Sequence, residues 1–221
     1  MRSHAKPDPS TNFSEAMASQ VRQAILDAIV RIGSGDASAD RVALTVERSP
    51  AAIAPTRLAH SHPGDAAAQE AARRLYESCL VHYRSVVRAQ DQVLGVDDVG
   101  AAVAAFVAAN FAALQGTVVT PGMLLSLEKQ LDGITRRSSD WEAAAVVERQ
   151  AYFEQMALLA VLVAESSAQA RAQGAAAVAN VQRTARVYLR QLLGMDPDHL
   201  ALGPNGLAAS AAAVSSSTAP D

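Results

Sequence analysis

The chain has 221 residues, of which 50% are apolar but only 4% are aromatic, and its formal net charge is −3. A core built mainly from Ala, Val and Leu favours an all-α protein, because alanine is the strongest helix former and small side chains let helices approach closely. The mild negative charge argues against a nucleic-acid binder, whose affinity comes largely from neutralising phosphates. The single cysteine, Cys79, excludes an internal disulfide, and we interpret it as a buried helical residue rather than a thiol activated by His82.

The beginning of the chain contains one predicted helix. Residues 1–13 are polar and proline-containing, and we expect them to be disordered. Because they lack the apolar stretch of a signal peptide, we expect either a cytoplasmic protein or a periplasmic or secreted one whose export signal is absent from this chain. Apolar residues at helical spacing then predict a helix over 14–32, which ends at the GSGD sequence.

The RVALTVE sequence (41–47) alternates in the manner of a β-strand. Because the chain contains no obvious second strand, we expect pairing with another molecule, or a helical turn instead of a strand. The residues from there to 64 are interpreted as loop, and they include His60 and His62. A metal site would need further ligands, so we interpret these histidines as solvated. The strand residues that we predict to bind a partner are Val42, Leu44 and Val46.

A helix over 65–91 leads into the strongest helical signal of the chain, which covers 97–115. Asp97 or Asp98 provides an N-cap acceptor, and Gly116 stands where a left-handed C-terminal residue belongs. The uncharged run of about 16 residues is shorter than the roughly 20 that a bilayer core requires, so we predict no transmembrane segment. Since apolar residues occur on nearly all sides, we place this helix at the centre of a soluble bundle.

Three further helices are predicted toward the end of the chain. A capping threonine followed by proline begins a helix over 121–132, which the next glycine ends. A capping box at Ser139 predicts a long helix from Trp141. The last helix, over 175–193, lies between two glycines. The residues of this last helix that we expect to face the core are Val178, Val181, Val187, Tyr188 and Leu192.

Together these elements predict an all-α fold, an up-down bundle of five or six helices with a flexible N-terminal segment and a flexible C-terminal tail. The bundle domain covers residues 65–207. Its helices are joined by short turns, which make neighbouring helices antiparallel. It follows a segment over 14–64 that contains one helix and an irregular or strand-like stretch. The low-complexity sequence 208–221 is expected to be disordered.

The sequence contains no HExxH, GxSxG, Walker, GxGxxG or CxxC motif, and we expect no cofactor and no metal. Glu148 and Glu154 interrupt the apolar part of the long helix, where a glutamate either acts as a general acid or pairs with an arginine. Residues 171–195 contain no acid. Their cations would therefore face either an anionic partner or acids on neighbouring helices. The arginines on one face of this segment, which we predict to bind a partner, are Arg183, Arg186 and Arg190.

Four stretches of the chain carry a family resemblance. They are GVDDVGAAVAAFVAANFAALQG (95–116), TPGMLLSLEKQL (120–131), the long helix from Trp141, and LLGMDPDHLALGPNGL (192–207). Together they resemble a domain-of-unknown-function family of small, alanine-rich, exported bacterial helical proteins. The resemblance covers about 59–207 and implies export to the periplasm or beyond. It implies no activity, and no catalytic residues are carried over from it.

We therefore interpret the protein as a non-enzymatic helical interaction protein, such as a scaffold, a chaperone or an accessory subunit of a bacterial envelope or secretion assembly. A protein partner is expected, a homo-oligomer is left open, and a nucleic-acid partner is not expected. Two alternatives remain. One is a hydrolase with an unrecognised carboxylate site at Glu148 or Glu154. The other is a carrier of a small apolar ligand, held between the helices at 97–115 and 141–165.

Overall fold

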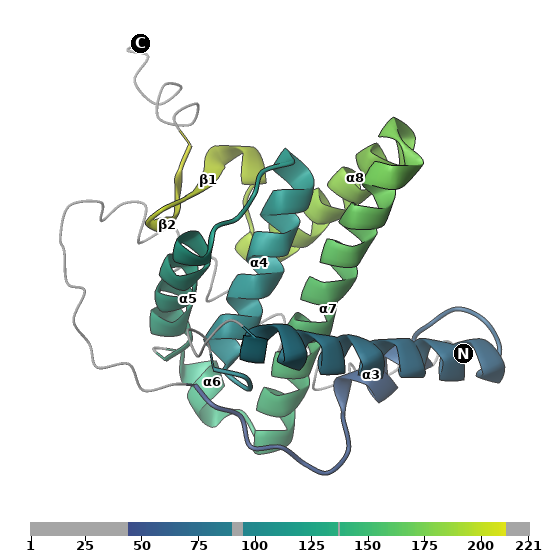
Figure 1. Ribbon diagram of the computed structural model, residues 1–221. Coiled ribbons are helices and arrows are strands. Elements are labelled where there is room, and N and C mark those ends of the chain that lie inside the picture. Colours follow the sequence, from purple (N-terminus) through teal and green to yellow (C-terminus); the bar gives the residue numbers. More distant parts are fainter. Residues whose placement is uncertain (1–43, 90–94, 137, 211–221) are drawn as a thin grey trace, which may run out of the picture.

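The computed structural model describes residues 44–89, 95–136 and 138–210 (Figure 1). In these ranges the chain is built from helices with one small hairpin, which confirms the all-α bundle. The helix expected over 14–32 lies outside the described residues, as do Val42 and the tail beyond residue 210. The helices are α2 (Ala54–His60), α3 (Ala66–Ala89), α4 (Val99–Gln115), α5 (Pro121–Arg136), α6 (Ser139–Ala143), α7 (Val146–Gln173) and α8 (Ala175–Leu193), followed by the 3-10 helix η1 (Pro197–His199) and the strands β1 (Leu200–Gly203) and β2 (Gly206–Ala209).

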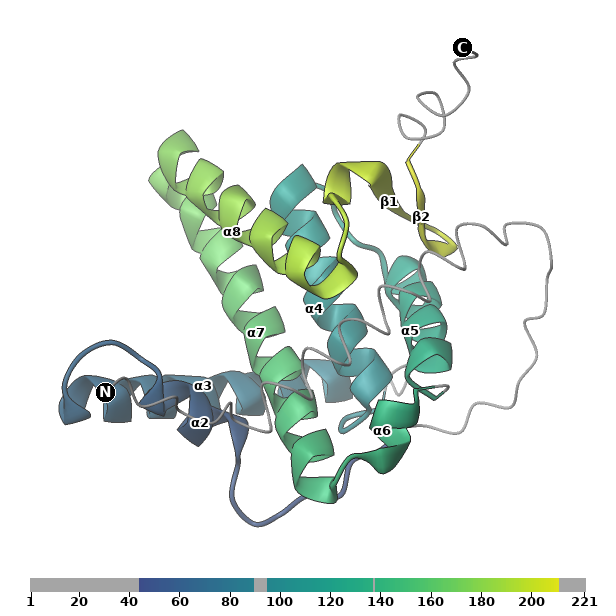
Figure 2. The same cartoon turned by 180° about the vertical axis from the view of Figure 1, so that it is seen from behind.

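Helix α4 occupies the centre of the bundle, as its apolar sequence predicts. It runs between α5 on one side and the α7–α8 pair on the other in both views (Figure 1 and Figure 2). Phe111 and Val107 are fully buried at 0% exposure, and Asn110 turns its side-chain amide back to the Phe106 carbonyl at 2.8 Å. None of the helices in the described ranges combines the length and the apolar character that a bilayer crossing needs.

The caps of α4 match the sequence-based prediction. The Asp98 carboxylate accepts a hydrogen bond from the Ala101 N–H at 2.9 Å, and Gly116 closes the other end at φ 67°. Asp98 is nevertheless almost fully buried, and this burial raises its pKa, with a smaller contribution from the neighbouring Asp132. The capping hydrogen bond opposes that rise, because it favours the charged form.

The raised pKa of Asp98 predicts a specific pH dependence of stability. A folded-state pKa above the unfolded value means that the native protein binds this proton more tightly, so the charged form costs stability as pH rises through the folded pKa. Asp98→Asn keeps the acceptor for the Ala101 N–H and removes the charge. We expect this variant to be at least as stable as the wild type at pH 7, with an advantage that shrinks toward pH 4.

Urea unfolding of both proteins between pH 4 and pH 8 measures this advantage. Asp98→Ala serves as the control, because it loses the cap as well as the charge and should be destabilised by about 1 kcal/mol. The raised pKa of Asp98 would be contradicted if the stability of Asp98→Asn minus that of wild type were lower at pH 7 than at pH 4.

Helix α3 lies across the bundle rather than along it, and its first turns project beyond α7 (Figure 1), with α2 beside them (Figure 2). Its inner face is buried at Leu80, Tyr83 and Val87, which contact the central core. Leu75 on the projecting part remains 54% exposed. The predicted helix over 65–91 is thus confirmed for its described residues.

Two predictions about helix boundaries are wrong. Helix α5 does not stop at Gly133 but continues to Arg136, because Ile134 and Thr135 are buried against the bundle. The long helix does not begin at Trp141: Ser138, rather than Ser139, caps the short helix α6, and α7 starts only at Val146. The guanidinium of Arg149 on α7 stabilises this break between the helices. It donates hydrogen bonds to two backbone carbonyls of α6, that of Trp141 at 3.1 Å and that of Glu142 at 2.8 Å.

The last helix has the predicted boundaries, but one of the side chains predicted to face the core is exposed. Gly174 precedes α8 and Gly194 ends it at φ 68°. Val187, expected in the core, is 48% exposed, whereas Leu189 and Leu193 are fully buried. The buried stripe of α8 is therefore displaced by part of a turn from the predicted one, because the helix packs against α4 as well as α7.

The end of the described chain forms a β-hairpin after the last helix. Strands β1 and β2 pair antiparallel around a two-residue loop, with Leu200 opposite Ala209 and Gly203 opposite Gly206. The side-chain amide of Gln130 on α5 bonds both main-chain groups of Leu207, at 2.9 Å and 3.1 Å. This contact closes the outer edge of β2 against the bundle.

Candidate functional site

The carboxylate of Glu154, one of the two predicted candidates for a general acid, is buried and hydrogen-bonded within the chain. Glu154 lies on α7 and is only 1% exposed. Its Oε2 accepts hydrogen bonds from the backbone N–H groups of Ile53 and Ala54 at 2.7 Å and 2.9 Å, at the start of α2. Its Oε1 accepts from the side chain of Gln150 at 2.8 Å. Both oxygens are thus engaged with the chain itself.

Neighbouring α7 side chains continue this attachment of the N-terminal segment. Gln150 accepts a hydrogen bond from the Ser49 N–H at 2.9 Å. Glu148 forms a bidentate pair with Arg57 of α2, with both N–O distances at 3.1 Å. We call residues 44–60 the strap, since this segment crosses the start of α7 and is held there by polar contacts. Helix α2 in the strap was missed from the sequence because its cap comes from about one hundred residues away.

This arrangement gives the two glutamates a structural role. A general acid or nucleophile must reach a substrate, but Glu154 is buried and its oxygens are occupied. Glu148 is held by the Arg57 guanidinium at the edge of the strap. The hydrolase hypothesis therefore receives no support from the positions of these carboxylates.

The predicted strand residues lie inside the molecule where they are described. Val46 is 6% exposed and belongs to the core, and Leu44 packs against that core. The segment makes a single antiparallel bridge, Thr45 to Asp98, with Val46 N–H bonded to the Asp97 carbonyl. Over its described residues this stretch forms one isolated bridge rather than a strand, and it pairs within the chain just before α4, which the sequence did not indicate. Whether a partner also binds there stays a prediction.

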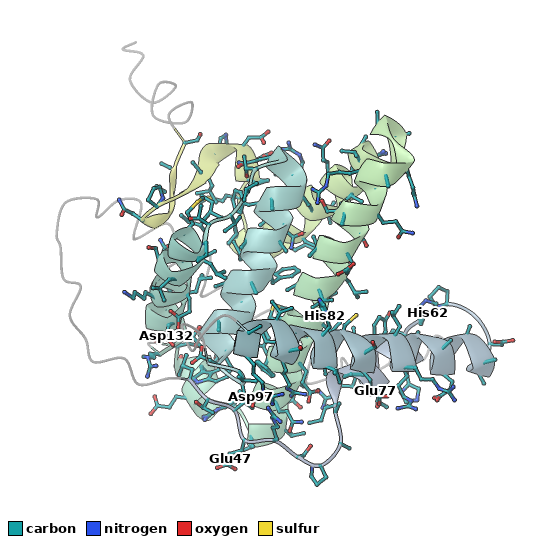
Figure 3. All side chains as sticks on the ribbon, viewed as in Figure 1. Glu47, His62, Glu77, His82, Asp97 and Asp132 are labelled. Carbon is teal, nitrogen blue, oxygen red and sulfur yellow. The ribbon has the colours of Figure 1, made fainter. Side chains whose placement is uncertain are left out.

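Ionic contacts reinforce this entry point of the strap. Asp97 pairs with Arg84 of α3 at 3.1 Å and with Arg48 of the strap. Figure 3 shows Asp97 where the strap and the last turns of α3 meet, below the ribbon of α3. The Arg84 guanidinium also lies 5.8 Å from the centroid of the Phe153 ring. These charges join the strap, α3 and α7 at one corner of the bundle.

Two of the three arginines predicted to bind a partner find acids within the chain. Arg186 binds Asp196 and Asp198 at 2.9 Å and 2.7 Å, and Arg190 also pairs with Asp196. The Arg190 guanidinium lowers the pKa of Asp196 below its usual value. The Asp-Pro-Asp turn after α8 therefore supplies the acids that the sequence left unassigned.

Arg183 stands apart from this network. Its guanidinium donates to the Asn180 side-chain oxygen at 2.7 Å, and among the described residues no carboxylate lies within salt-bridge distance of it. Its side chain is exposed. Arg183 is thus the one of the three predicted arginines that presents its charge outward.

The histidines and the cysteine do not assemble a reactive site in the described part of the chain. His62 lies by the loop that leads into α3, above the ribbon of that helix and away from His82, which lies nearer the bundle (Figure 3). His82 lies 3.9 Å from Glu165 across the surface of α7. Burial raises the pKa of the Cys79 thiol, which disfavours the reactive thiolate. No group of three or more metal-binding side chains occurs among the residues that the structure describes.

A groove between α7 and α8 is the candidate binding site. Its volume is about 220 Å³, and its floor is apolar. Ser166, Asn180 and Thr184 form its polar rim. The apolar residues that line it are Leu159, Leu162 and Val163 from α7, and Val181, Ala185 and Tyr188 from α8.

The groove lies on the part of α7 and α8 that leads to their joined tips, which extend away from α4 in both views (Figure 1 and Figure 2). Near it, Gln182 of α8 binds the Leu114 carbonyl at 3.2 Å, which fixes α8 against the end of α4. Beyond that contact most side chains of the two helices up to Gly174 are exposed. The carrier hypothesis placed its apolar cavity between α4 and α7, whereas the observed groove is lined by α7 and α8.

The chain belongs to a family of unknown function, DUF6683, whose model matches residues 5–210. This match confirms the resemblance to a domain-of-unknown-function family and extends it to the N-terminal part of the chain. No curated protein and no solved structure matches the chain.

Proposed function

We infer that the protein is a non-enzymatic, protein-binding helical module, acting as a scaffold, a chaperone or an accessory subunit of a bacterial envelope or secretion assembly. One observation carries this proposal. The buried carboxylate of Glu154 on α7 holds the strap, while farther along the same helix α7 and α8 form an open apolar groove beside the exposed Arg183. The envelope location rests on the exported character that the resemblance implies.

A carrier of a small apolar ligand is the second candidate, and the groove is the observation that favours it. Its apolar floor suits a hydrocarbon group. Its volume of about 220 Å³ is smaller than the roughly 300–1,000 Å³ of typical small-molecule pockets. The dimensions therefore favour side chains of a protein segment over a lipid.

The proposal predicts a specific protein partner. We expect chemical cross-linking in the native organism, followed by affinity purification of the full tagged chain, to recover one protein that binds again when both are purified. Titration calorimetry of the purified pair measures the affinity and the stoichiometry. Failure of every recovered protein to bind the purified chain would contradict the proposed function.

A truncation tests the contribution of the predicted strand to that partner. Removal of residues 1–43 is the suitable change, since it includes Val42 and leaves the strap in place. Removal of residues 1–58 would leave the buried Glu154 without its two backbone donors and would confuse unfolding with lost binding. Unchanged affinity of the shorter chain would exclude residues before Leu44 from the interface.

A further inference from the structure

The shape of the groove between α7 and α8 fits one kind of occupant. Its lining on α7 extends from Leu159 to Ser166, which is about 10 Å along the helix axis. Two antiparallel helices, joined at Gly174, form its walls. An amphipathic helix places apolar side chains at i, i+3, i+4 and i+7 into grooves of this kind, and i to i+7 spans the same two turns. The groove therefore has the length for the anchor residues of one helix.

The size of the hollow agrees with this occupant. A volume of about 220 Å³ accommodates a few apolar side chains but little backbone. Tyr188 and Leu162 contribute large apolar surfaces to it, and the polar Thr184 and Asn180 stand at its border. An apolar centre with a polar border is the usual anatomy of a protein–protein contact.

The charge beside the groove selects among helices. Arg183 donates to Asn180, a rim residue, so its guanidinium lies at the α8 border of the groove. Arg186 and Arg190, in contrast, are neutralised by Asp196 and Asp198. Glu165 is the acid next to the α7 border, on the other wall of the groove, and it lies 3.9 Å from His82 of α3. Because Arg183 lies at the α8 border, that border is positive. A helix with acidic residues flanking its apolar stripe therefore complements it.

We propose that this groove binds an amphipathic helix of a partner protein, with the apolar stripe seated between α7 and α8 and an acidic residue of that helix facing Arg183. The inference rests on the proposed protein-binding function and specifies the surface and the chemistry of the partner segment. The acidic residue determines orientation and preference, while the apolar side chains contribute most of the affinity.

Two synthetic peptides of about 18 residues, long enough for several helical turns, test the proposal against the full chain. Both carry the same leucine stripe; one has glutamates and the other lysines on the remaining positions. Fluorescence anisotropy of the labelled peptides measures Kd at low and high salt. We expect the glutamate peptide to bind at least fivefold more tightly than the lysine peptide, with the difference reduced by salt.

Two variants of the chain assign this binding to the groove. Arg183→Glu should weaken the glutamate peptide about fivefold and strengthen the lysine peptide, because one attraction becomes a repulsion. Ser166→Trp places a large side chain at the rim of the groove and should weaken both peptides more than tenfold. Arg88→Glu and Val81→Trp, at exposed positions of α3, introduce the same side chains elsewhere and should leave both affinities unchanged.

The outcomes separate this inference from the proposed function. Equal affinities of the two peptides, no saturable binding, or identical behaviour of Arg183→Glu and Arg88→Glu would each overturn the inference. A concentration-dependent dimer in sedimentation equilibrium that Ser166→Trp abolishes would overturn it in favour of a second copy of this chain. A native partner that still binds the Ser166→Trp and Arg183→Glu variants would overturn the inference and leave the proposed function standing.

Discussion

Replacing Glu154 by alanine is expected to lower the free energy of unfolding by about 3 kcal/mol. The substitution leaves the N–H groups of Ile53 and Ala54 and the amide of Gln150 without their acceptor in a buried site. It also removes side-chain volume from a position that is 1% exposed. Urea unfolding monitored by circular dichroism measures the loss, and hydrogen exchange should show faster exchange of the Ile53 and Ala54 amides.

Glu154→Gln is a sharper variant, because it preserves the shape of the side chain. Its new NH₂ group would face the amide NH₂ of Gln150, and rotating the Gln150 amide would direct that NH₂ at the Ser49 N–H instead. One donor stays unsatisfied in either arrangement, so we expect a loss of about 1–2 kcal/mol. Glu47→Ala, an exposed acid of the strap, is the control and should change stability by less than about 0.5 kcal/mol. Equal stability of the Glu154→Ala variant and wild type would refute the capping role.

Helix ends that depend on local chemistry were predictable from the sequence. Asp98 and Gly116 bound α4 because a carboxylate and a glycine satisfy groups in their own helix. The same holds for Gly194 after α8. The burial of α4 also followed from its composition, since a helix without a polar face must be covered on all sides. These features need no knowledge of the rest of the fold.

Features that depend on distant residues were not predictable. Helix α2 is capped by Glu154 of α7, and the break before α7 is held by Arg149 binding the end of α6. The strand-like stretch pairs at Asp98, a residue that the sequence indicated only as a helix cap. In each case a side chain or backbone group of one element binds a different element. The residue spacing within a single segment does not indicate such a contact.

The candidate site shows the same division. The sequence marked Arg183, Arg186 and Arg190 as one basic face, and all three residues lie on α8. It could not distinguish Arg183 from the other two, because the acids that neutralise them come from the turn after the helix. The groove beside Arg183 depends on how α7 and α8 pack against each other, which spacing within one helix does not reveal. A sequence signal was available only for the charge and not for the hollow.

The strap and the groove lie on different parts of α7, and this separation bears on function. Glu148, Gln150 and Glu154 attach the strap at the beginning of the helix, whereas the groove starts at Leu159. A partner helix in the groove would therefore not compete with the strap for the same side chains. Stability and binding can thus be altered by different substitutions in one helix.

Replacing Phe111 by alanine is expected to lower the free energy of unfolding by about 4 kcal/mol. Phe111 is fully buried in α4, so the substitution loses the transfer free energy of the ring and leaves a cavity. An effect of this size is a large fraction of the roughly 5–15 kcal/mol that stabilises a typical domain. Urea unfolding with an unchanged dependence on denaturant measures it.

Two matched variants make the Phe111 result specific to the central position of α4. Phe111→Leu keeps most of the apolar volume and should cost only about 1 kcal/mol, because a smaller cavity remains. Val118→Ala removes apolar atoms at a position that is 85% exposed and should change stability by less than about 0.5 kcal/mol. If Phe111→Ala were as mild as Val118→Ala, α4 would not be enclosed by α5, α7 and α8. Contacts to α4 position α7 and α8, and with them the groove and the arginines of α8. The described positions of the groove and of these arginines would then also be wrong.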